Sequence, residues 1–214
     1  MYPELAQKVK EGKLLLEWDN SKGTPPAPLL KDVHGTERRI AKVLNFSIAY
    51  GKTSRGLAKD WNVSVKEATE ILNKWYADRP EVKEWQERTI ETAIQTGYTR
   101  TLLGRYRKLD GIQSKKRSIR NHAMRAAINT PLQGGAADVV NRAMVKLSRN
   151  DRLVHLGWKQ ILQIHDEIIL EGPEESTQEA LHLVTKIMEN PLDEPLLIKL
   201  EIACNSGKSW YDAK

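Results

Sequence analysis

The spacing of hydrophobic and polar residues predicts mostly helices in the first two thirds of the chain. Amphipathic helical segments begin at about residue 36, after Ser64 and near Pro80, and another covers residues 118–128. Ser64 and Glu67 match a capping box, and Pro80 suits a first helical turn. Because these start signals are local, we expect the helices to form where the pattern puts them.

Glycine and proline mark the segments between these helices. Thr36 is expected to cap the helix that ends at Gly51, and Gly97 to end the helix that follows residue 80. The stretch 21–28 is rich in proline, which predicts a turn-rich linker. Residues 98–116 mix aromatic, basic and glycine residues without a clear period, as a hairpin or loop does.

The last third of the chain mixes helices and strands. Pro131 is expected to break the helix that begins near Ser118, with Thr130 capping a new helix that runs to about Leu147. The elements predicted beyond it are a strand on each side of residues 165–166, a helix over residues 176–188 and a last strand over residues 196–202.

Composition limits the class of protein. With 214 residues and 40% hydrophobic content, the chain can bury the core of one domain or two small ones. The single cysteine, Cys204, excludes an intrachain disulfide framework, fits a reducing compartment and suits a small core position. No apolar run approaches the roughly 20 residues needed to cross a bilayer, so no membrane partner is expected.

Charge favours a polyanionic partner. The formal net charge is +6, and the basic residues concentrate between residues 100 and 125, where Asp110 is the only acid. The basic residues of this stretch are Arg100, Arg105, Arg107, Lys108, Lys115, Lys116, Arg117, Arg120 and Arg125. Between residues 166 and 201 acids predominate instead, which indicates a solvated face remote from nucleic acid.

Two groups of residues carry candidate chemistry. Arg38, Lys42, Phe46 and Tyr50 recur every four residues, so each lags the last by about 40° and all share one helical face. Arg38 to Phe46 spans roughly 12 Å along a helix, comparable with the distance from a triphosphate to its base. In QIHDEIILE, the adjacent acids Asp166 and Glu167 lie between two apolar runs, where a hairpin tip would present them to a divalent metal.

These motifs resemble those of one enzyme family, in the same order. RRIAKVLNFSIAYG resembles the nucleotide-binding helix of a family A DNA polymerase, NTPLQGGAAD a helix start that follows it, and QIHDEIILE its metal-bearing hairpin. The resemblance covers nearly all of the chain, including TLLGRYRKLD and GKSWYDAK, and is nearest to bacterial and plant-organelle members. It implies an α+β fold in which a mostly helical fingers subdomain is inserted in a partial antiparallel-sheet palm. The expected parts are a segment leading into the fingers at 1–35, the fingers at 36–117 and the C-terminal part of the palm at 118–214.

The resemblance also implies the activity and the roles of the site residues. The expected reaction is template-directed addition of deoxynucleotides (dNTPs) to a primer 3′ end, in replication or repair, with two Mg²⁺ ions or Mn²⁺ as metals. Asp166 and Glu167 are the catalytic metal-binding candidates, although Glu167 also suits a role at the primer terminus. Arg38 and Lys42 would hold the triphosphate, with Lys42 as general acid, while Phe46 packs on the sugar and base and Tyr50 lies at the template position.

Other residues are expected to contact primer-template DNA. Arg125, Asn129 and Gln133 are again four apart and, by resemblance, face the minor groove, while His165 contacts the primer backbone. Arg105 and Arg107 lie in the basic stretch and are predicted to meet phosphates.

The family carries a further catalytic aspartate in a strand motif resembling DYSQIELR, and no such string occurs in this sequence. We therefore expect a partial polymerase whose missing N-terminal portion is a partner, and which by itself is inactive. Alternatives are a catalytically dead DNA-binding fragment and a phage-type single-subunit RNA polymerase, whose hairpin usually reads HDS. The expected location is intracellular: plastid or mitochondrion for a plant organellar member, otherwise cytoplasm or nucleoid.

Overall fold

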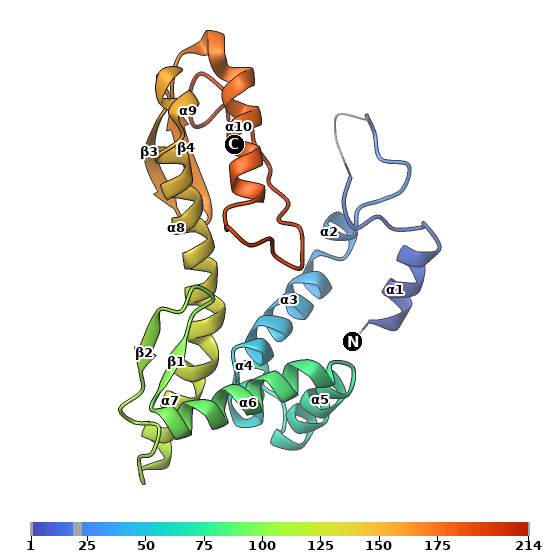
Figure 1. Ribbon diagram of the computed structural model, residues 1–214. Coiled ribbons are helices and arrows are strands. Elements are labelled where there is room, and N and C mark those ends of the chain that lie inside the picture. Colours follow the sequence, from blue (N-terminus) through green and yellow to red (C-terminus); the bar gives the residue numbers. More distant parts are fainter. Residues whose placement is uncertain (1, 19–22, 214) are drawn as a thin grey trace. The chain divides into compact units, whose positions relative to one another are not determined.

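The computed structural model describes residues 2–18 and 23–213, and its helices and strands are labelled in Figure 1. The chain divides into two compact units, Met1–Gln95 with Asp110–Ile128 and Thr96–Leu109 with Asn129–Lys214. Helices combine with small antiparallel hairpins, which confirms the predicted α+β class. Among the described residues, no helix combines the length and apolar character that crossing a membrane requires.

The first unit is helical. Its elements are α1 (Pro3–Lys10), α2 (Leu30–Val33), α3 (Gly35–Ala49), α4 (Ser54–Trp61), α5 (Val65–Ala77), α6 (Pro80–Thr96) and α7 (Arg117–Asn129). Helices α4 and α5 pack against each other (Figure 1). Its core is formed by Leu44, Ile48, Leu57, Ala58, Ala68, Leu72 and Trp75.

The local start and stop signals of this unit act largely as predicted. The Ser64 hydroxyl accepts a hydrogen bond from the Glu67 amide at 3.1 Å, and the Glu67 carboxylate accepts one from the Ser64 amide at 2.9 Å, so the capping box is confirmed. Helix α6 begins at Pro80 and ends before Gly97, whose φ of +79° favours glycine. Gly51 follows α3 with φ of +75° and ends it as expected.

The predicted start of α3 is wrong. The helix begins at Gly35 with His34 as its N-cap, and Thr36 already lies inside the first turn. Because α2 ends at Val33, only His34 separates the two helices, and the chain has no extended residue at position 36. Ser21 and Lys22 of the predicted linker lie outside the described residues, while residues 23–28 are non-helical as expected.

A buried amide holds the end of α3. The side chain of Gln86, on α6, donates from Nε2 to the carbonyl oxygens of Ile48 and Ala49, both at 3.0 Å, and its Oε1 accepts from the Tyr76 hydroxyl at 2.7 Å. Carbonyls in the last turn of a helix have no partner within that helix. Gln86 therefore supplies a donor to Ala49 and a second one to Ile48, which also accepts from the Gly51 amide at 2.8 Å, and it joins α3, α5 and α6.

The second unit combines two hairpins with helices. Its elements are β1 (Tyr98–Arg100), β2 (Tyr106–Lys108), the π-helical turn η2 (Thr130–Gly134), α8 (Gly135–Ser148), α9 (Asp151–His155), β3 (Lys159–Ile164), β4 (Glu167–Glu171), the 3₁₀ turn η3 (Glu174–Ser176) and α10 (Thr177–Glu189). Helix α8 packs against α10 and β3 (Figure 1). Leu147, Leu153, Ala180 and Val184 form its core, with Cys204 partly buried against it.

A close approach fixes the end of the β3–β4 hairpin. A Cβ at Gly172 would lie 2.4 Å from the indole of Trp158, which no side chain can tolerate. The indole Nε1 in turn donates to the Ser176 hydroxyl at 2.8 Å. Glycine at position 172 therefore lets the chain turn across the Trp158 ring toward α10.

Two predictions for this unit are wrong. Pro131 does not break the chain's helical path, because residues 130–134 form a π-helical turn whose wider ring accommodates proline. Thr130 accordingly caps no new helix. Residues 196–202 form no strand, and the described residues offer them no neighbouring strand to pair with, since β3 and β4 pair only with each other. Leu197 and Ile198 are consequently exposed.

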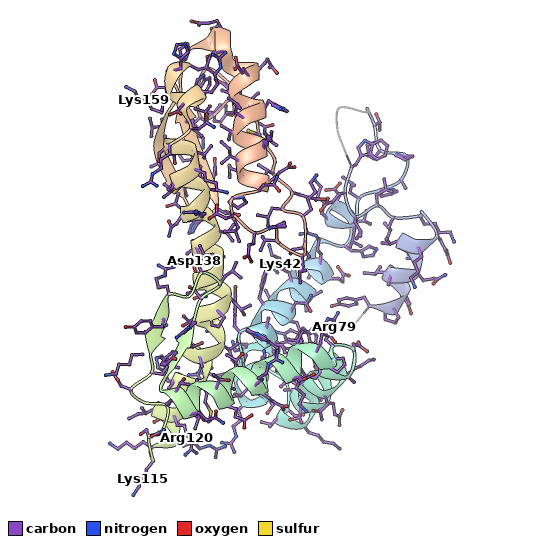
Figure 2. All side chains as sticks on the ribbon, in the orientation of Figure 1. Lys42, Arg79, Lys115, Arg120, Asp138 and Lys159 are labelled. Carbon is purple, nitrogen blue, oxygen red and sulfur yellow. The ribbon has the colours of Figure 1, made fainter. Side chains whose placement is uncertain are left out.

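The β1–β2 hairpin is attached to α8 through a buried carboxylate. Asp138, labelled in Figure 2, accepts a hydrogen bond from the Leu103 amide at 3.1 Å. Its carboxylate also forms an ion pair with the guanidinium of Arg105. Burial raises the pKa of Asp138, but these contacts outweigh burial and hold the pKa below its ordinary value. The loop between β1 and β2 is thereby fixed to the start of α8.

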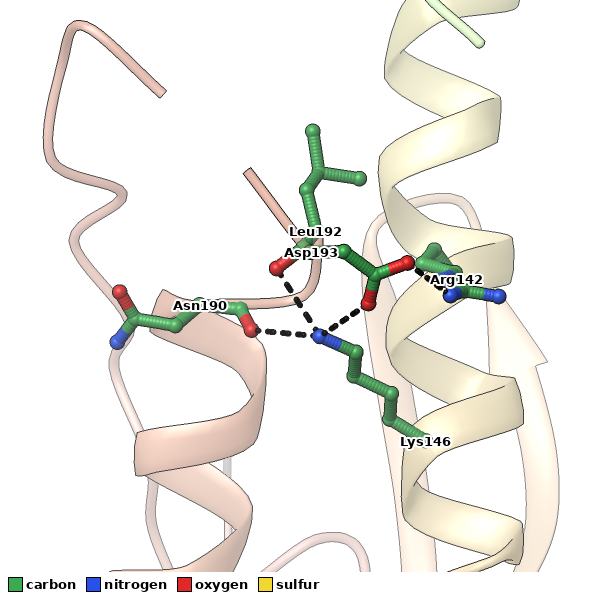
Figure 3. A network of polar contacts seen from close by, with 5 residues as sticks. All are labelled: Arg142, Lys146, Asn190, Leu192 and Asp193. Atoms are coloured by element: carbon green, nitrogen blue, oxygen red, sulfur yellow. Dashed lines mark hydrogen bonds and ion pairs between the residues drawn. The ribbon is translucent and has the colours of Figure 1, made fainter. Parts of the chain in front are cut away.

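The loop after α10 is attached to α8 by two cations (Figure 3). Lys146 Nζ donates to the Leu192 carbonyl at 3.0 Å and lies 3.3 Å from the Asp193 carboxylate, which also pairs with Arg142. The hydrogen bond from Arg142 is the main cause that lowers the pKa of Asp193. Beside it lies an open hollow of about 330 Å³ lined by Arg142, Val145, Lys146, Arg149, Asn150 and Ile187.

Replacing Gln86 by leucine should destabilise the first unit. The Ala49 carbonyl and the Tyr76 hydroxyl would lose this partner, while the Ile48 carbonyl keeps the Gly51 amide. Each buried unsatisfied group costs about 1–3 kcal/mol, so the free energy of unfolding should fall by at least about 2 kcal/mol. Urea denaturation followed by tryptophan fluorescence measures the change. The matched control is Gln95→Leu, at an exposed position of the same helix; equal losses in both variants would contradict the role given to Gln86.

The contribution of Asp138 should depend on pH. Its folded pKa is lowered, so the charged carboxylate stabilises the fold above the unfolded value of about 3.9, and this stabilisation is lost as pH falls through the folded pKa. Asp138→Asn should therefore lower the unfolding free energy at neutral pH, with a difference from wild type that shrinks in acid. Urea denaturation across pH measures it; exposed Asp151→Asn is the control. A difference that grows in acid would be inconsistent with this account.

Candidate nucleotide-binding and metal-binding residues

The structure brings three of the four predicted nucleotide-binding residues into contact on α3. The ammonium of Lys42 lies 5.7 Å from the centre of the Phe46 ring, and the Phe46 and Tyr50 rings stack with centres 6.1 Å apart and planes inclined by 16°. Figure 2 labels Lys42 on this helix. Arg38 lies one turn before Lys42 and is exposed. The predicted series of two cations followed by two rings is therefore present on one helix.

The opposite side of α3 explains why this face is turned outward. Leu44 and Ile48 are buried in the core, and the Asn45 side chain accepts a hydrogen bond from the Trp75 indole at 2.8 Å. Phe46 is 49% exposed and takes no part in that core. The ring of Phe46 is therefore not a core residue within this unit.

The predicted metal ligand Asp166 lies at the tip of the β3–β4 hairpin. Ile164 pairs with Glu167, so His165 and Asp166 form a two-residue loop. His165 has a φ of +54°, which mirror-image hairpin turns require at this position and which is uncommon for a residue with a side chain. The side-chain amide of Gln163 donates to the His165 carbonyl and supports this conformation.

The two adjacent acids have different surroundings. Glu167 accepts a hydrogen bond from the Trp210 indole at 2.9 Å, which ties the C-terminal segment to the hairpin. Asp166 is exposed and has no hydrogen bond or ion pair with the residues that the structure describes. Its carboxylate oxygens fit a hard cation such as Mg²⁺. Within the same residues, no group of three or more histidine, cysteine, aspartate or glutamate side chains is placed to hold a metal ion.

The predicted DNA-binding residues differ in how far they are already engaged. Arg105 pairs with Asp138, and Arg107 donates to the Thr130 hydroxyl at 3.5 Å. His165 is exposed at the hairpin tip. Gln133 is exposed on the π-helical turn, whereas the side-chain oxygen of Asn129 is buried without a hydrogen-bond partner in the described part of the chain.

The residues of two predicted surfaces, the minor-groove face and the basic stretch, are distributed over both units. Arg125 belongs to the first unit, and Asn129 and Gln133 belong to the second, so a common minor-groove face stays a prediction. In the basic stretch, the cations up to Lys108 belong to the second unit and those from Lys115 onward to the first. Figure 2 labels Lys115 and Arg120 of the latter group.

Sequence reasoning missed three residues that support the site. Gln86 holds the C-terminal end of the nucleotide face, Asp138 fixes Arg105, and Trp210 holds Glu167. The nucleotide face is the side of α3 and its C-cap that carries Arg38, Lys42, Phe46 and Tyr50. One signal was available, since Gln86 comes four residues after Val82 and seven before buried Ala93, which puts an amide on the apolar side of α6. Partners far apart in sequence left no comparable signal for the other two.

Comparison with known proteins gives consistent matches. The model of DNA polymerase family A matches residues 27–212. DNA polymerase I A, chloroplastic/mitochondrial, of Arabidopsis thaliana is 51% identical over 218 aligned positions, covering 100% of this chain and 21% of that protein. DNA polymerase I of Geobacillus stearothermophilus is 41% identical and covers 86% of this chain and 21% of its own length.

Solved structures agree. The POL domain of Pol1 from M. smegmatis, in a complex with DNA primer-template and dNTP, superposes with a TM-score of 0.77 at 34% identity, covering 82% of this chain and 31% of that one. The chain spans about a fifth of the length of the relatives it matches. The ordered motifs, the family match over most of the sequence and the identity to relatives across all of it show that the chain belongs to DNA polymerase family A.

Proposed function

We propose that these residues form the nucleotide-binding and part of the metal-binding apparatus of a DNA polymerase that adds dNTPs to a primer 3′ end. The observation that carries the proposal is the series formed by exposed Lys42 and Phe46 on α3 and half-buried Tyr50 at the C-cap of that helix. The primer-template DNA and dNTP named for the M. smegmatis structure are the partners proposed here. In this reading residues 36–117 belong to the fingers and residues 118–214 to the palm.

The nucleotide face divides the work between cations and rings. Arg38 and Lys42 bind the triphosphate, the guanidinium as a planar fork and the ammonium as a point charge. Phe46 packs against the sugar and base of the incoming nucleotide, and Tyr50 marks the template position. The Phe46 and Tyr50 rings stack on each other, which fixes their orientation before a nucleotide binds.

The β3–β4 hairpin contributes the carboxylates Asp166 and Glu167 to the reaction centre. Asp166 would hold the metal, and Glu167, oriented by Trp210, would support the primer terminus or the surroundings of the metal. Mg²⁺ bound there would lower the pKa of the primer hydroxyl and offset the charge of the pyrophosphate that leaves. Lys42 lies on the triphosphate side and donates a proton to the leaving pyrophosphate.

Several further assignments belong to the same proposal. Arg125, Asn129 and Gln133 contact the minor groove, and His165 the primer backbone. Arg107 meets a phosphate, while Arg105 does so only if its pair with Asp138 leaves other donors of its guanidinium available. The polymerase acts in replication or repair, and we place it in a plastid or mitochondrion because relatives named for those organelles share 47–51% identity.

Asp166→Asn should abolish primer extension while leaving DNA binding unchanged. The amide keeps the size of the side chain but removes the negative charge that a divalent metal requires. The test joins this chain to the upstream portion of a family A relative and measures extension and DNA binding in parallel. The chain by itself should not extend a primer, since Glu167 is engaged by Trp210 and Asp166 alone does not hold two ions.

The matched control for this variant is Asp151→Asn, which neutralises an exposed carboxylate of the same unit. It should extend primers at the wild-type rate. Wild-type turnover in Asp166→Asn would refute the metal assignment, and extension by the 214 residues alone would refute the proposed need for a further carboxylate.

Phe46→Tyr should raise the acceptance of dideoxynucleotides. The ring lies about 6 Å along α3 from Lys42 and so near the sugar, where a tyrosine hydroxyl can replace the missing 3′ hydroxyl as a donor to the β-phosphate. A hydrogen bond to a charged group is worth roughly 1.5–3 kcal/mol, so the dideoxy-to-deoxy incorporation ratio should rise at least about tenfold.

The measurement compares incorporation efficiencies in the same joined polymerase. Ile40→Tyr is the control, because it places a phenol on the same helix about 120° away from Phe46. An unchanged ratio in Phe46→Tyr, or an equal rise in Ile40→Tyr, would overturn the placement of the sugar beside this ring.

A further inference from the structure

The β1–β2 hairpin presents a second surface with rings and cations. Tyr98 pairs with Lys108, Thr99 with Arg107, and Arg100 with Tyr106. Side chains alternate along each strand and paired residues share a face. The outer face of the hairpin therefore carries Tyr98, Arg100, Tyr106 and Lys108, while Thr99, on the other face, is only 6% exposed.

The two tyrosines on this outer face form a tilted pair of rings. Their ring centres lie 5.8 Å apart with planes inclined by 58°, and the guanidinium of Arg100 covers Tyr98 at 5.3 Å while donating to its hydroxyl at 3.3 Å. Tyr106 is the outermost ring, with 71% of its surface exposed. A ring that served only to stabilise the hairpin would be expected to bury more of its area.

The charge of the hairpin narrows the choice of ligand. Every charged side chain in β1 and β2 is a cation, namely Arg100, Arg107 or Lys108. Cations flanking an exposed ring suit a ligand that has both phosphates and accessible base faces. A duplex hides its base faces in the stack, and an acidic peptide offers charge without a planar ring, so single-stranded DNA fits best.

We infer that the outer face of the β1–β2 hairpin binds single-stranded DNA, with a base stacked on Tyr106 and neighbouring phosphates on Arg100 and Lys108. The surface lies entirely within the second unit and uses none of the residues assigned to catalysis. It goes beyond the proposed polymerase function, because binding there requires no nucleotide addition. Buried Asp138 fixes the adjoining loop, so the hairpin is a formed platform for a flexible strand.

The test measures binding of the 214-residue chain to two labelled oligomers by fluorescence anisotropy. One is a short oligothymidylate, and the other is an abasic oligomer of equal length that keeps the phosphates but lacks the bases. Wild type should prefer the oligothymidylate. Tyr106→Ile removes the ring but keeps a residue that strands favour, and it should weaken oligothymidylate binding about fivefold or more, since stacking on an aromatic side chain is worth that much per base.

Salt dependence separates the ring from the cations. Arg100→Gln should reduce the slope of log affinity against log salt by about 0.7, as expected for one lost phosphate contact to a single strand. Tyr106→Ile should leave this slope and the affinity for the abasic oligomer unchanged. Tyr106→Phe should bind as wild type does, which separates loss of stacking from loss of the hydroxyl.

Tyr211→Ile is the matched control, since Tyr211 is 90% exposed in the same unit and lies outside the hairpin. It should have no effect. The inference is overturned if Tyr106→Ile leaves oligothymidylate binding unchanged, if it weakens binding of the abasic oligomer equally, or if an acidic peptide competes as well as the oligothymidylate. None of these outcomes depends on primer extension, so failure here and failure of the polymerase assignment are distinguishable.

Discussion

The exposed face of α3 depends on how the rest of that helix is held. Leu44 and Ile48 bury one side of the helix, and the amide of Gln86 satisfies the carbonyls at its C-terminal end. A helix end with unpaired carbonyls frays, and Tyr50 lies at this end. The buried amide therefore keeps the last ring of the nucleotide face in register with Phe46 and Lys42.

Three carboxylates of the second unit differ in burial and in hydrogen bonding. Asp138 is buried and engaged by the β1–β2 loop, Glu167 accepts from the Trp210 indole, and Asp166 is left exposed at a hairpin tip. Only the last is available to a ligand without losing an internal contact. Adjacent acids in the sequence are thus not equivalent in the fold, because Asp166 belongs to the two-residue loop whereas Glu167 is the first residue of β4.

The cations likewise fall into those that form ion pairs within the fold and those that lie against aromatic rings. Arg105, Arg142 and Lys146 are occupied by Asp138 and Asp193, where they attach loops to α8. Such pairs reduce the number of cations that remain for phosphate below the 34 lysines and arginines of the sequence. Arg100 and Lys42 instead lie against tyrosine and phenylalanine rings, which leaves their charge directed to solvent beside an aromatic surface.

Sequence by itself determined the elements whose signals are local. The capping box at Ser64, the proline and glycine limits of α6 and the two-residue loop at His165 and Asp166 depend on neighbouring residues, and the four-residue spacing from Arg38 to Tyr50 fixes a helical face wherever the helix forms. Only the tertiary structure decided which of these side chains stay exposed and which are paired. The partners of Gln86, Asp138 and Glu167 lie 10 to 43 residues away in sequence, and the described residues offer Leu196 to Ile202 no strand to pair with. The pairing at these positions therefore follows from packing between elements, and periodicity along the chain does not reveal the partners.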